Sequence, residues 1–317
     1  MSPLRVRSQA VLSTRAWVDA EHCFAVLDAC DAPAVYERML AATDVEVTSA
    51  IKYLNALPGT LPSGRGMVAS IAQGRALLDA ARLFGVEVNS GFEKLVARHD
   101  DAGVVVPFGA GLTLTVIGPA RKELGLYQKK WNADLTDGKK EGRVASARLD
   151  KNAFNLASIA VLAEVGGRTM LLTGDAGGAP LLEGLEAAGR LSADGRMKVD
   201  VMKLPHHGSS ANVTLELLSR VTAETYVVSA NGKHDNPDRE TLNRLTEARG
   251  SEPYTLACTF RERAHDFVEG DSKEANERRL ALRNVDAWAS SNPNVTMVYR
   301  APGENGVRVE LGDETLD

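Results

Sequence analysis

Residues 199–209 read Val-Asp-Val-Met-Lys-Leu-Pro-His-His-Gly-Ser, an apolar run followed closely by a pair of histidines. The run has the length and the β-branched content of a buried strand. The imidazoles of His206 and His207 are therefore expected at the exposed end of that strand. Imidazole is a common ligand of transition metals. This stretch predicts an α/β fold with a metal or catalytic site at a strand end.

Two further polar clusters also follow apolar strands. Thr173-Gly174-Asp175 comes after residues 170–172, and residues 233–237 (Lys-His-Asp-Asn-Pro) come after residues 227–228. Strand ends at one edge of a sheet converge in space, and a carboxylate with several imidazoles suits zinc, manganese or iron. Each cluster alone has an ordinary explanation, because an Asp after Thr-Gly often caps a helix or forms a turn. A lone histidine such as His234 is more often a surface or core residue than a ligand.

Strands and helices alternate from residue 155 onward, which predicts helices covering the faces of a sheet. Upstream of that, the turn Gly109-Ala110-Gly111 predicts a β-hairpin, and near the end of the chain the glycines of residues 303–306 predict a closing hairpin. The strands are expected at 104–108, 112–117, 159–163, 168–172, 199–204, 225–229, 254–259, 295–299 and 307–311, and the helices at 121–134, 179–188, 213–220, 239–249 and 273–288.

Taken together, the motifs resemble the second half of a metallo-β-lactamase-fold hydrolase. They are residues 155–159, 171–176, 201–209 and 233–237, and the closest branch is the stand-alone relatives of the hydrolase domain in ComEC-type competence proteins for DNA uptake. The resemblance extends upstream through residues 88–92, 112–119 and Lys130-Trp131, and covers roughly residues 66–260. It implies a four-layer αββα sandwich with a dinuclear metal site at one edge of the sheets.

The resemblance also divides the chain. Residues 1–60 would form a mostly helical N-terminal segment, and residues 61–317 a metallo-β-lactamase-like domain that is incomplete at its N-terminal side. A helix and the hairpin would close this domain from about residue 261.

The same resemblance implies roles for individual residues. Asp175 would bridge two divalent metal ions, zinc or alternatively manganese, and His207 would complete the second metal. His206 would reach the substrate, although the reverse assignment of the two histidines stays open. His234 matches a position near the substrate oxygens or the metal. Asn155 and Ser209 would lie around the site, where Asn155 either takes a polar role or holds its loop.

One part of the family pattern is missing. Relatives carry His-x-His-x-Asp-His in the N-terminal half, and the sequences around His22, His99 and His265 do not reproduce it. The opening strands that carry this motif also have no counterpart. We weigh three explanations: a truncated chain, a chain completed by another polypeptide, and a pseudoenzyme that keeps only the scaffold. We favour truncation, because Asp175 and His206-His207 are retained.

Two functions follow from these observations. The first is a metal-dependent hydrolase that cleaves phosphodiesters, in a small molecule or in nucleic acid, with His206 and His234 orienting or protonating the leaving oxygen. The alternative is a non-catalytic scaffold that binds a partner. A serine hydrolase using Ser209 is disfavoured, because no Gly-x-Ser-x-Gly elbow surrounds it.

Composition limits the classes of partner and compartment. The chain has 317 residues, 44% of them hydrophobic, and a net charge of -5, so its overall field repels a polyanion. Residues 121–151 hold nine basic against five acidic residues, and we interpret them as a solvated helix and loop rather than a phosphate-binding patch. Three cysteines without a CxxC pair indicate a reducing compartment. With no secretion signal and no long apolar run, we expect a soluble cytoplasmic protein without membrane contact.

Overall fold

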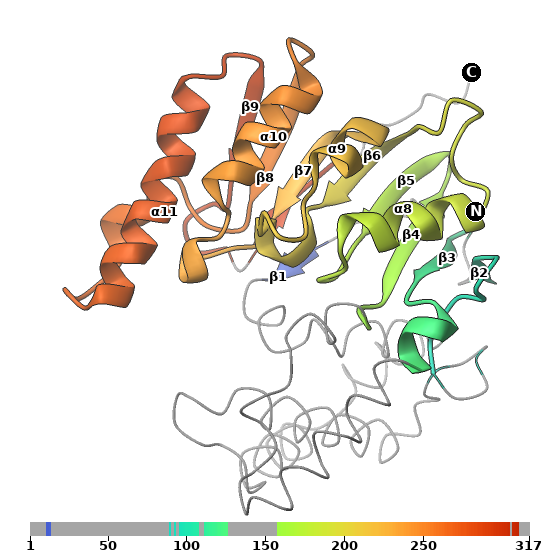
Figure 1. Ribbon diagram of the computed structural model, residues 1–317. Helices are drawn as coiled ribbons and strands as arrows, with labels where there is room; N and C mark the ends of the chain where they lie inside the picture. Colours follow the sequence, from blue (N-terminus) through green and yellow to red (C-terminus); the bar gives the residue numbers. More distant parts are fainter. Residues whose placement is uncertain are drawn as a thin grey trace, which may run out of the picture.

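The computed structural model describes residues 11–13, 89, 92, 95–107, 111–125, 157–304 and 306–310. Within these residues the centre of the fold is a mixed eight-stranded sheet in the order β2-β3-β4-β5-β6-β7-β8-β9 (Figure 1). Its strands are β2 Val104–Pro107, β3 Thr113–Gly118, β4 Ala160–Val165, β5 Arg168–Leu172, β6 Met197–Lys203, β7 Val221–Val228, β8 Tyr254–Cys258 and β9 Val295–Tyr299.

The first half of the sheet is antiparallel. Strands β2 and β3 pair as a hairpin, and β3 continues the antiparallel pairing with β4, as β4 does with β5. Gly166 and Gly167 connect β4 to β5 with φ angles of 53° and 73°. Two successive positive φ angles are what a type I′ turn requires, and glycine adopts them without a steric penalty. The hairpin expected between residues 104–108 and 112–117 is confirmed, and the strands expected at 159–163 and 168–172 form a second hairpin.

The second half of the sheet is parallel, from β5 to β9. A helix lies in each connection: α8 Gly178–Ala187, α9 Leu215–Arg220, α10 Arg239–Arg249 and α11 Lys273–Ser290. Parallel crossovers are right-handed almost without exception, and the strands here advance in one direction across the sheet. All of these helices therefore cover the same face, as Figure 1 shows. The sequence predicted the positions of these strands and helices to within a few residues.

The main core lies between this face and the helices. Its fully buried members come from neighbouring strands, for example Leu171 in β5, Met202 in β6 and Tyr226 in β7. On the helical side they include Leu185, Leu217, Leu242 and Val285. The helices thus bury the apolar side chains of this face in β6, β7 and β8, while those of β9 are partly buried.

A smaller apolar cluster occupies the opposite face of the sheet. It consists of Val201, Val227 and Ala257 together with Val307. Val307 belongs to β10, Gly306–Arg308, which pairs antiparallel with β1, Val11–Ser13, in a separate two-stranded sheet. The rest of the expected helical segment 1–60 lies outside the described residues.

The predicted closing hairpin is wrong. Strand β9 pairs in parallel with β8, and β10 pairs with β1 rather than with β9. The reason lies at Arg300, directly after β9. Its backbone N–H donates to the carbonyl oxygens of Cys258 and Phe260, at 3.1 and 3.2 Å, and its Nε donates to Thr259 O at 2.9 Å. These bonds hold the end of β9 against the end of β8, so the chain leaves the sheet instead of folding back along β9.

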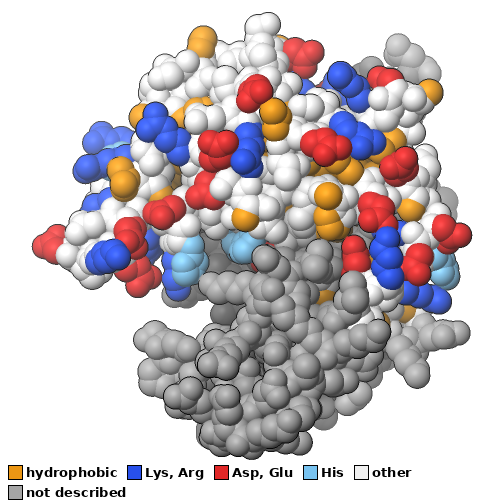
Figure 2. Space-filling view, in the orientation of Figure 1, with side chains coloured by type: hydrophobic (Ala, Val, Ile, Leu, Met, Phe, Trp, Pro, Cys, Tyr) orange, Lys and Arg blue, Asp and Glu red, His pale blue; other side chains and the backbone are white. Residues whose placement is uncertain are grey.

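The observed architecture is α/β, as expected. Residues 121–125 are helical, which agrees with the beginning of the helix predicted from Arg121, and residues 126–156 lie outside the described residues. Over the part of the chain that is described, no helix is both long enough and apolar enough to cross a membrane. Figure 2 shows acidic and basic side chains interspersed over the helical face, in keeping with the small net charge.

Candidate functional site

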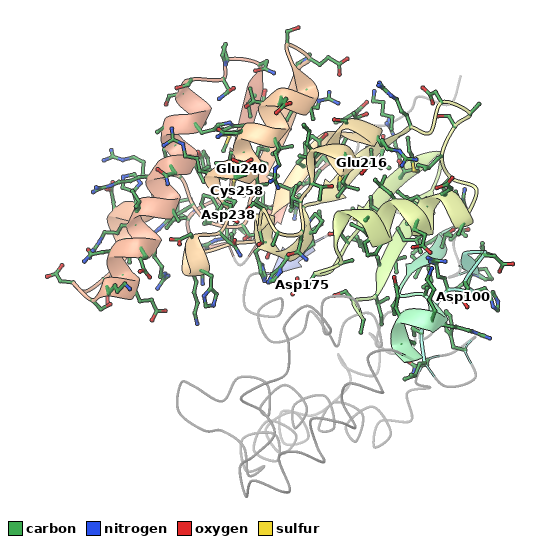
Figure 3. The ribbon with its side chains drawn as sticks, in the orientation of Figure 1. Asp100, Asp175, Glu216, Asp238, Glu240 and Cys258 are labelled. Atoms are coloured by element: carbon green, nitrogen blue, oxygen red, sulfur yellow. The ribbon has the colours of Figure 1, made fainter. Side chains whose placement is uncertain are left out.

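The three polar clusters lie at one edge of the sheet. Because β5, β6 and β7 are parallel neighbours, the segments that follow them emerge at the same edge. Asp175 lies in the turn after β5, and His206 and His207 are the two middle residues of the short turn Pro205–Gly208 after β6. His234 lies in the 3-10 turn after β7, Lys233–Asp235. Figure 3 shows Asp175 at this edge.

Hydrogen bonds join the segment after β5 to the segment after β6. The His206 backbone N–H donates to Gly174 O at 3.1 Å, and the buried Lys203 donates from Nζ to the same oxygen at 3.3 Å. Thr173 donates from Oγ1 to Lys203 O at 2.8 Å. Hydrogen bonds made by the residues next to Asp175 and by the backbone of His206 therefore hold these two residues beside each other.

Asp175 and His206 approach each other directly. Oδ2 of Asp175 lies 3.9 Å from Nε2 of His206, and the Asp175 side chain is 16% exposed. Its other oxygen, Oδ1, is buried and has no hydrogen-bond partner within the described part of the chain. A buried carboxylate oxygen without a donor is costly, and a cation satisfies it. The pair therefore offers a carboxylate and an imidazole on one side of a potential cation site.

Asn212 fixes the orientation of the His206 ring. Its Nδ2 donates to the backbone oxygen of Asp175 at 2.8 Å, and its Oδ1 lies 2.9 Å from Nδ1 of His206. A backbone oxygen can only accept, so the amide orientation is determined and Oδ1 must face the ring. Nδ1 of His206 is then the donor. In the neutral ring, Nε2 is the unprotonated nitrogen, and it is the one nearer to Asp175.

His207 is held in a similar way. Its Nδ1 lies 2.5 Å from the backbone oxygen of Ser229, just beyond β7. This oxygen can only accept a proton, so Nδ1 donates and Nε2 of the neutral ring is unprotonated. A backbone oxygen on the second ring nitrogen is the usual arrangement that orients a metal-binding histidine. The ring centroids of His206 and His207 are 6.0 Å apart.

The backbone of the histidine loop is left-handed. His206 and His207 have φ angles of 46° and 59°, and Gly208 follows at 83°. His234 also has a positive φ, of 56°. For residues other than glycine such conformations cost on the order of 1–3 kcal/mol, and in folded proteins they concentrate at functional sites. His206, His207 and His234 thus share a positive φ angle, which the sequence does not reveal.

Helix α10 and its N-cap residue form hydrogen bonds with the segment that follows the two histidines. Asp238, its N-cap residue, accepts from both the backbone N–H and the hydroxyl of Ser210 at 2.7 Å. Arg244 donates to Ser210 O and Val213 O at 2.6 and 2.7 Å. The backbone of Asp238 also donates to Gly208 O at 3.1 Å. These contacts keep the loop in its strained conformation.

His234 lies in the neighbouring loop and is exposed. The two loops are in contact, since Asn236 donates from Nδ2 to His206 O at 3.4 Å. The loop that carries His234 also packs against α11, where Arg278 donates from Nε to Asn231 O at 3.3 Å. The structure thus brings Asp175 together with His206. His207 lies in the same loop as His206, and His234 lies in the adjacent loop.

The other residues named from the sequence have different positions. The backbone N–H of Ser209 donates to His206 O at 2.9 Å and so helps to close the histidine turn. Asn155 lies outside the described residues. His99 is exposed, whereas His265 lies 3.1 Å from Asp266 and 3.0 Å from Asp286. Cys258 is fully buried in β8, and this burial, followed by the charge of Asp286, raises the pKa of its thiol, so it stays protonated.

Sequence reasoning missed three residues at this edge: Asn212, Asp238 and Ser158. The hydroxyl of Ser158 accepts from the backbone N–H of Asp175 at 3.2 Å. Ser158 lies within the motif of residues 155–159, but nothing in the sequence distinguishes it from its neighbours. Asn212 and Asp238 stand just before a helix, where such residues are read as caps. Only their partners across the fold show that they support Asp175 and the histidine loop.

Among the described residues, no group of three or more His, Cys, Asp or Glu side chains is arranged to hold a metal ion. The donors at this edge therefore fit one side of a cation site, and a complete site needs further ligands. No protein-family model matches the chain, and no curated protein matches it.

Proposed function

We propose that this chain supplies the Asp175, His206 and His207 side of a metal-dependent hydrolase site of the metallo-β-lactamase type, and that its substrate is a phosphodiester. The proposal rests on one observation above all. A buried carboxylate oxygen of Asp175 lacks a donor in the described part, while the other oxygen lies 3.9 Å from an imidazole nitrogen. A sheet with helices on one face also agrees with half of the αββα sandwich.

The residues have distinct tasks in this proposal. Asp175 and His206 would hold a zinc or manganese ion, with His207 as the alternative imidazole, and the remaining ligands would come from outside the described residues. A bound divalent cation would lower the pKa of a bound water molecule. It would also place a positive charge beside the leaving oxygen. His234, exposed in the adjacent loop, would donate a proton to the leaving oxygen or bind a phosphoryl oxygen.

The first test is metal binding by the full chain. We expect zinc or manganese to bind, and to raise the free energy of unfolding by about 2.7 kcal/mol when free metal is at 100 times Kd. Asp175→Asn and His206→Gln should each abolish both effects in calorimetric titration and thermal unfolding. His99→Gln, which changes an exposed histidine away from these loops, is the matched control and should bind like the unmodified chain. Metal uptake that survives Asp175→Asn would refute the proposed site.

Hydrolysis is the second test of this proposal. The metal-loaded chain should cleave bis(p-nitrophenyl) phosphate, and Asp175→Asn should be inactive. His234→Gln should keep the metal but lose activity by about 10²–10⁴-fold if this side chain transfers a proton. A chain that binds the metal but cleaves neither this diester nor nucleic acid is not a phosphodiesterase.

A second candidate, a non-catalytic scaffold, is favoured by one observation. The described residues do not assemble three metal-binding side chains. A scaffold would fold without metal, and its melting temperature would not respond to EDTA or to added zinc. The same thermal-unfolding experiment therefore separates the two candidates.

A further inference from the structure

We propose that Asn212 is a positioning residue that locks His206 in the tautomer with the proton on Nδ1, so that the lone pair of Nε2 faces Asp175. This inference rests on the proposed function for its purpose, but the geometry that carries it does not require a bound metal. It assigns His206, rather than His207, as the imidazole that works together with Asp175.

The argument begins with an oxygen that cannot donate. Asn212 contacts Asp175 through the backbone carbonyl oxygen, at 2.8 Å from Nδ2. Reversing the amide would place two acceptors against each other, so the orientation of the side chain is fixed. Oδ1 of Asn212 then faces Nδ1 of His206 at 2.9 Å and requires a donor there.

Without this bond the tautomer would reverse. The carboxylate of Asp175 lies 3.9 Å from Nε2 and attracts a proton to that nitrogen. A ring protonated on Nε2 would donate to the carboxylate and have no lone pair directed at a cation. Asn212 counteracts this attraction, because its Oδ1 accepts a hydrogen bond from Nδ1 of His206 and so favours the proton on that nitrogen. The side chain is well placed for the task, since it is only 6% exposed and precedes the tightly packed Val213 and α9.

Asn212 also ties together two segments that are far apart in the sequence. One amide group contacts the backbone of Asp175 and the ring of His206, which follow different strands. Any movement of the Asp175 turn is thereby transmitted to the imidazole. Outer hydrogen-bond partners of this kind typically change metal affinity by about 10–100-fold when they are removed.

The test reads the tautomer directly. Long-range ¹H–¹⁵N correlation spectra of the metal-free, ¹⁵N-histidine-labelled chain are recorded at about pH 8, above the ordinary imidazole pKa of about 6.5. His206→Gln assigns the signals. We expect the Nδ1–H tautomer in the unmodified chain and the Nε2–H tautomer in Asn212→Leu. An Nε2–H tautomer in the unmodified chain, or no change in Asn212→Leu, would overturn the inference.

Asn292→Leu is the matched control for general loss of stability. Asn292 also uses both ends of its amide, donating to Trp288 O at 2.6 Å and accepting from Thr246 at 3.0 Å, at the end of α11. Its replacement should leave the His206 tautomer unchanged. Asn212→Asp is a second variant that keeps an acceptor for Nδ1, so it should preserve the tautomer even though it loses the bond to Asp175 O.

Metal titration separates failure of this inference from failure of the proposed function. Zinc affinity should fall by about 10–100-fold in Asn212→Leu and stay unchanged in Asn292→Leu. If the unmodified chain has the Nδ1–H tautomer but binds no zinc, the proposed function fails and the role of Asn212 in orienting the ring stands. If zinc binds equally well to Asn212→Leu with an unchanged tautomer, the inference fails and the metal site stands.

Discussion

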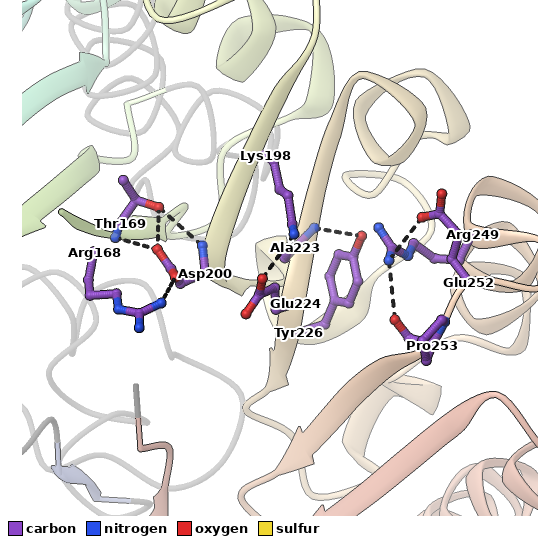
Figure 4. Close-up of polar contacts among 10 residues, drawn as sticks. All are labelled: Arg168, Thr169, Lys198, Asp200, Ala223, Glu224, Tyr226, Arg249, Glu252 and Pro253. Carbon is purple, nitrogen blue, oxygen red and sulfur yellow. Dashed lines mark hydrogen bonds and ion pairs between the residues drawn. The ribbon is translucent and has the colours of Figure 1, made fainter. Parts of the chain in front are cut away.

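At the scale of single residues, the carboxylate of Asp200 in the middle of β6 makes a pH-dependent contribution to stability. It accepts from the backbone N–H and the hydroxyl of Thr169 at 2.7 and 2.8 Å and from Arg168 at 2.9 Å (Figure 4). Burial acts to raise the pKa of this carboxyl, but the bonds from Thr169 and Arg168 outweigh it and lower the pKa below the ordinary 3.8. The charged form is therefore stabilised by folding.

The sign of the pH dependence follows from this shift. Because the folded-state pKa lies below the unfolded-state pKa, the stabilisation is complete above about pH 4 and is lost as the pH falls through the folded-state pKa. Asp200→Asn should reduce the free energy of unfolding by about 1–3 kcal/mol at pH 7 and flatten its decline below pH 4. Urea unfolding between pH 2 and pH 7 measures both effects.

Glu224→Gln is the control for Asp200→Asn. Glu224 pairs with Lys198 at 2.9 Å, but these side chains are 57% and 67% exposed. Exposed ion pairs contribute little, so this change should stay within about 1 kcal/mol. An equal loss in the two variants would show that Asp200 acts only through its surface charge.

Residue types and their order were enough to predict that these polar residues lie at one edge of the sheet, because a polar cluster after each of three apolar strands is visible in the sequence. The structure brings Asp175 and His206 together as that pattern suggests. The left-handed backbone of the histidines and the bridge through Asn212 could not be predicted. Both depend on contacts between segments that are distant in the sequence, and Asn212 on its own reads as a helix cap.

At the scale of elements, the packing of α8 on β3 depends on Gly184. A Cβ at this position would overlap the carbonyl oxygen of Ile117, so helix and strand are in backbone contact there. In an exposed helix, replacing glycine by alanine stabilises by about 1 kcal/mol. Here Gly184→Ala should instead destabilise by about 1–3 kcal/mol, because helix and strand must separate.

Chemical denaturation of Gly184→Ala beside Gly125→Ala measures this effect. Gly125 is the last described residue of the helical stretch 121–125, and among the described residues a Cβ there would meet no atom within 4 Å. Its replacement should be neutral or stabilising. If both variants were equally stable, α8 would be able to move away from β3 without cost.

Most elements were predicted, because alternation and turn chemistry are local signals. The closing hairpin was predicted wrongly, because the residue pattern of a strand does not show which other strand it pairs with. Residues 295–299 and 306–308 are both strands, yet one joins β8 and the other joins β1. The bonds from Arg300 that decide the outcome reach back across about 40 residues.

At the scale of the whole molecule, burial is concentrated at the centre of the sheet. Strands β6 and β7 are paired on both sides and packed on both faces, whereas β2 lies at an edge of the described sheet with Val105 58% exposed. Amide hydrogen exchange should therefore be slowest in residues 199–203 and 225–228 and much faster in residues 104–107. Exchange followed by mass spectrometry tests this order. Equal protection in β2 and β7 would mean that the molecule opens as a single unit.

From β2 to β9, the order of strands across the sheet repeats their order along the chain. During synthesis, each new strand emerges when its neighbour already exists, so the sheet can grow from one side as the ribosome advances. The pair of β1 and β10 is different, because Val11–Ser13 must wait for residues 306–308. The pairing of β1 with β10 can therefore form only after every strand of the eight-stranded sheet has been synthesised.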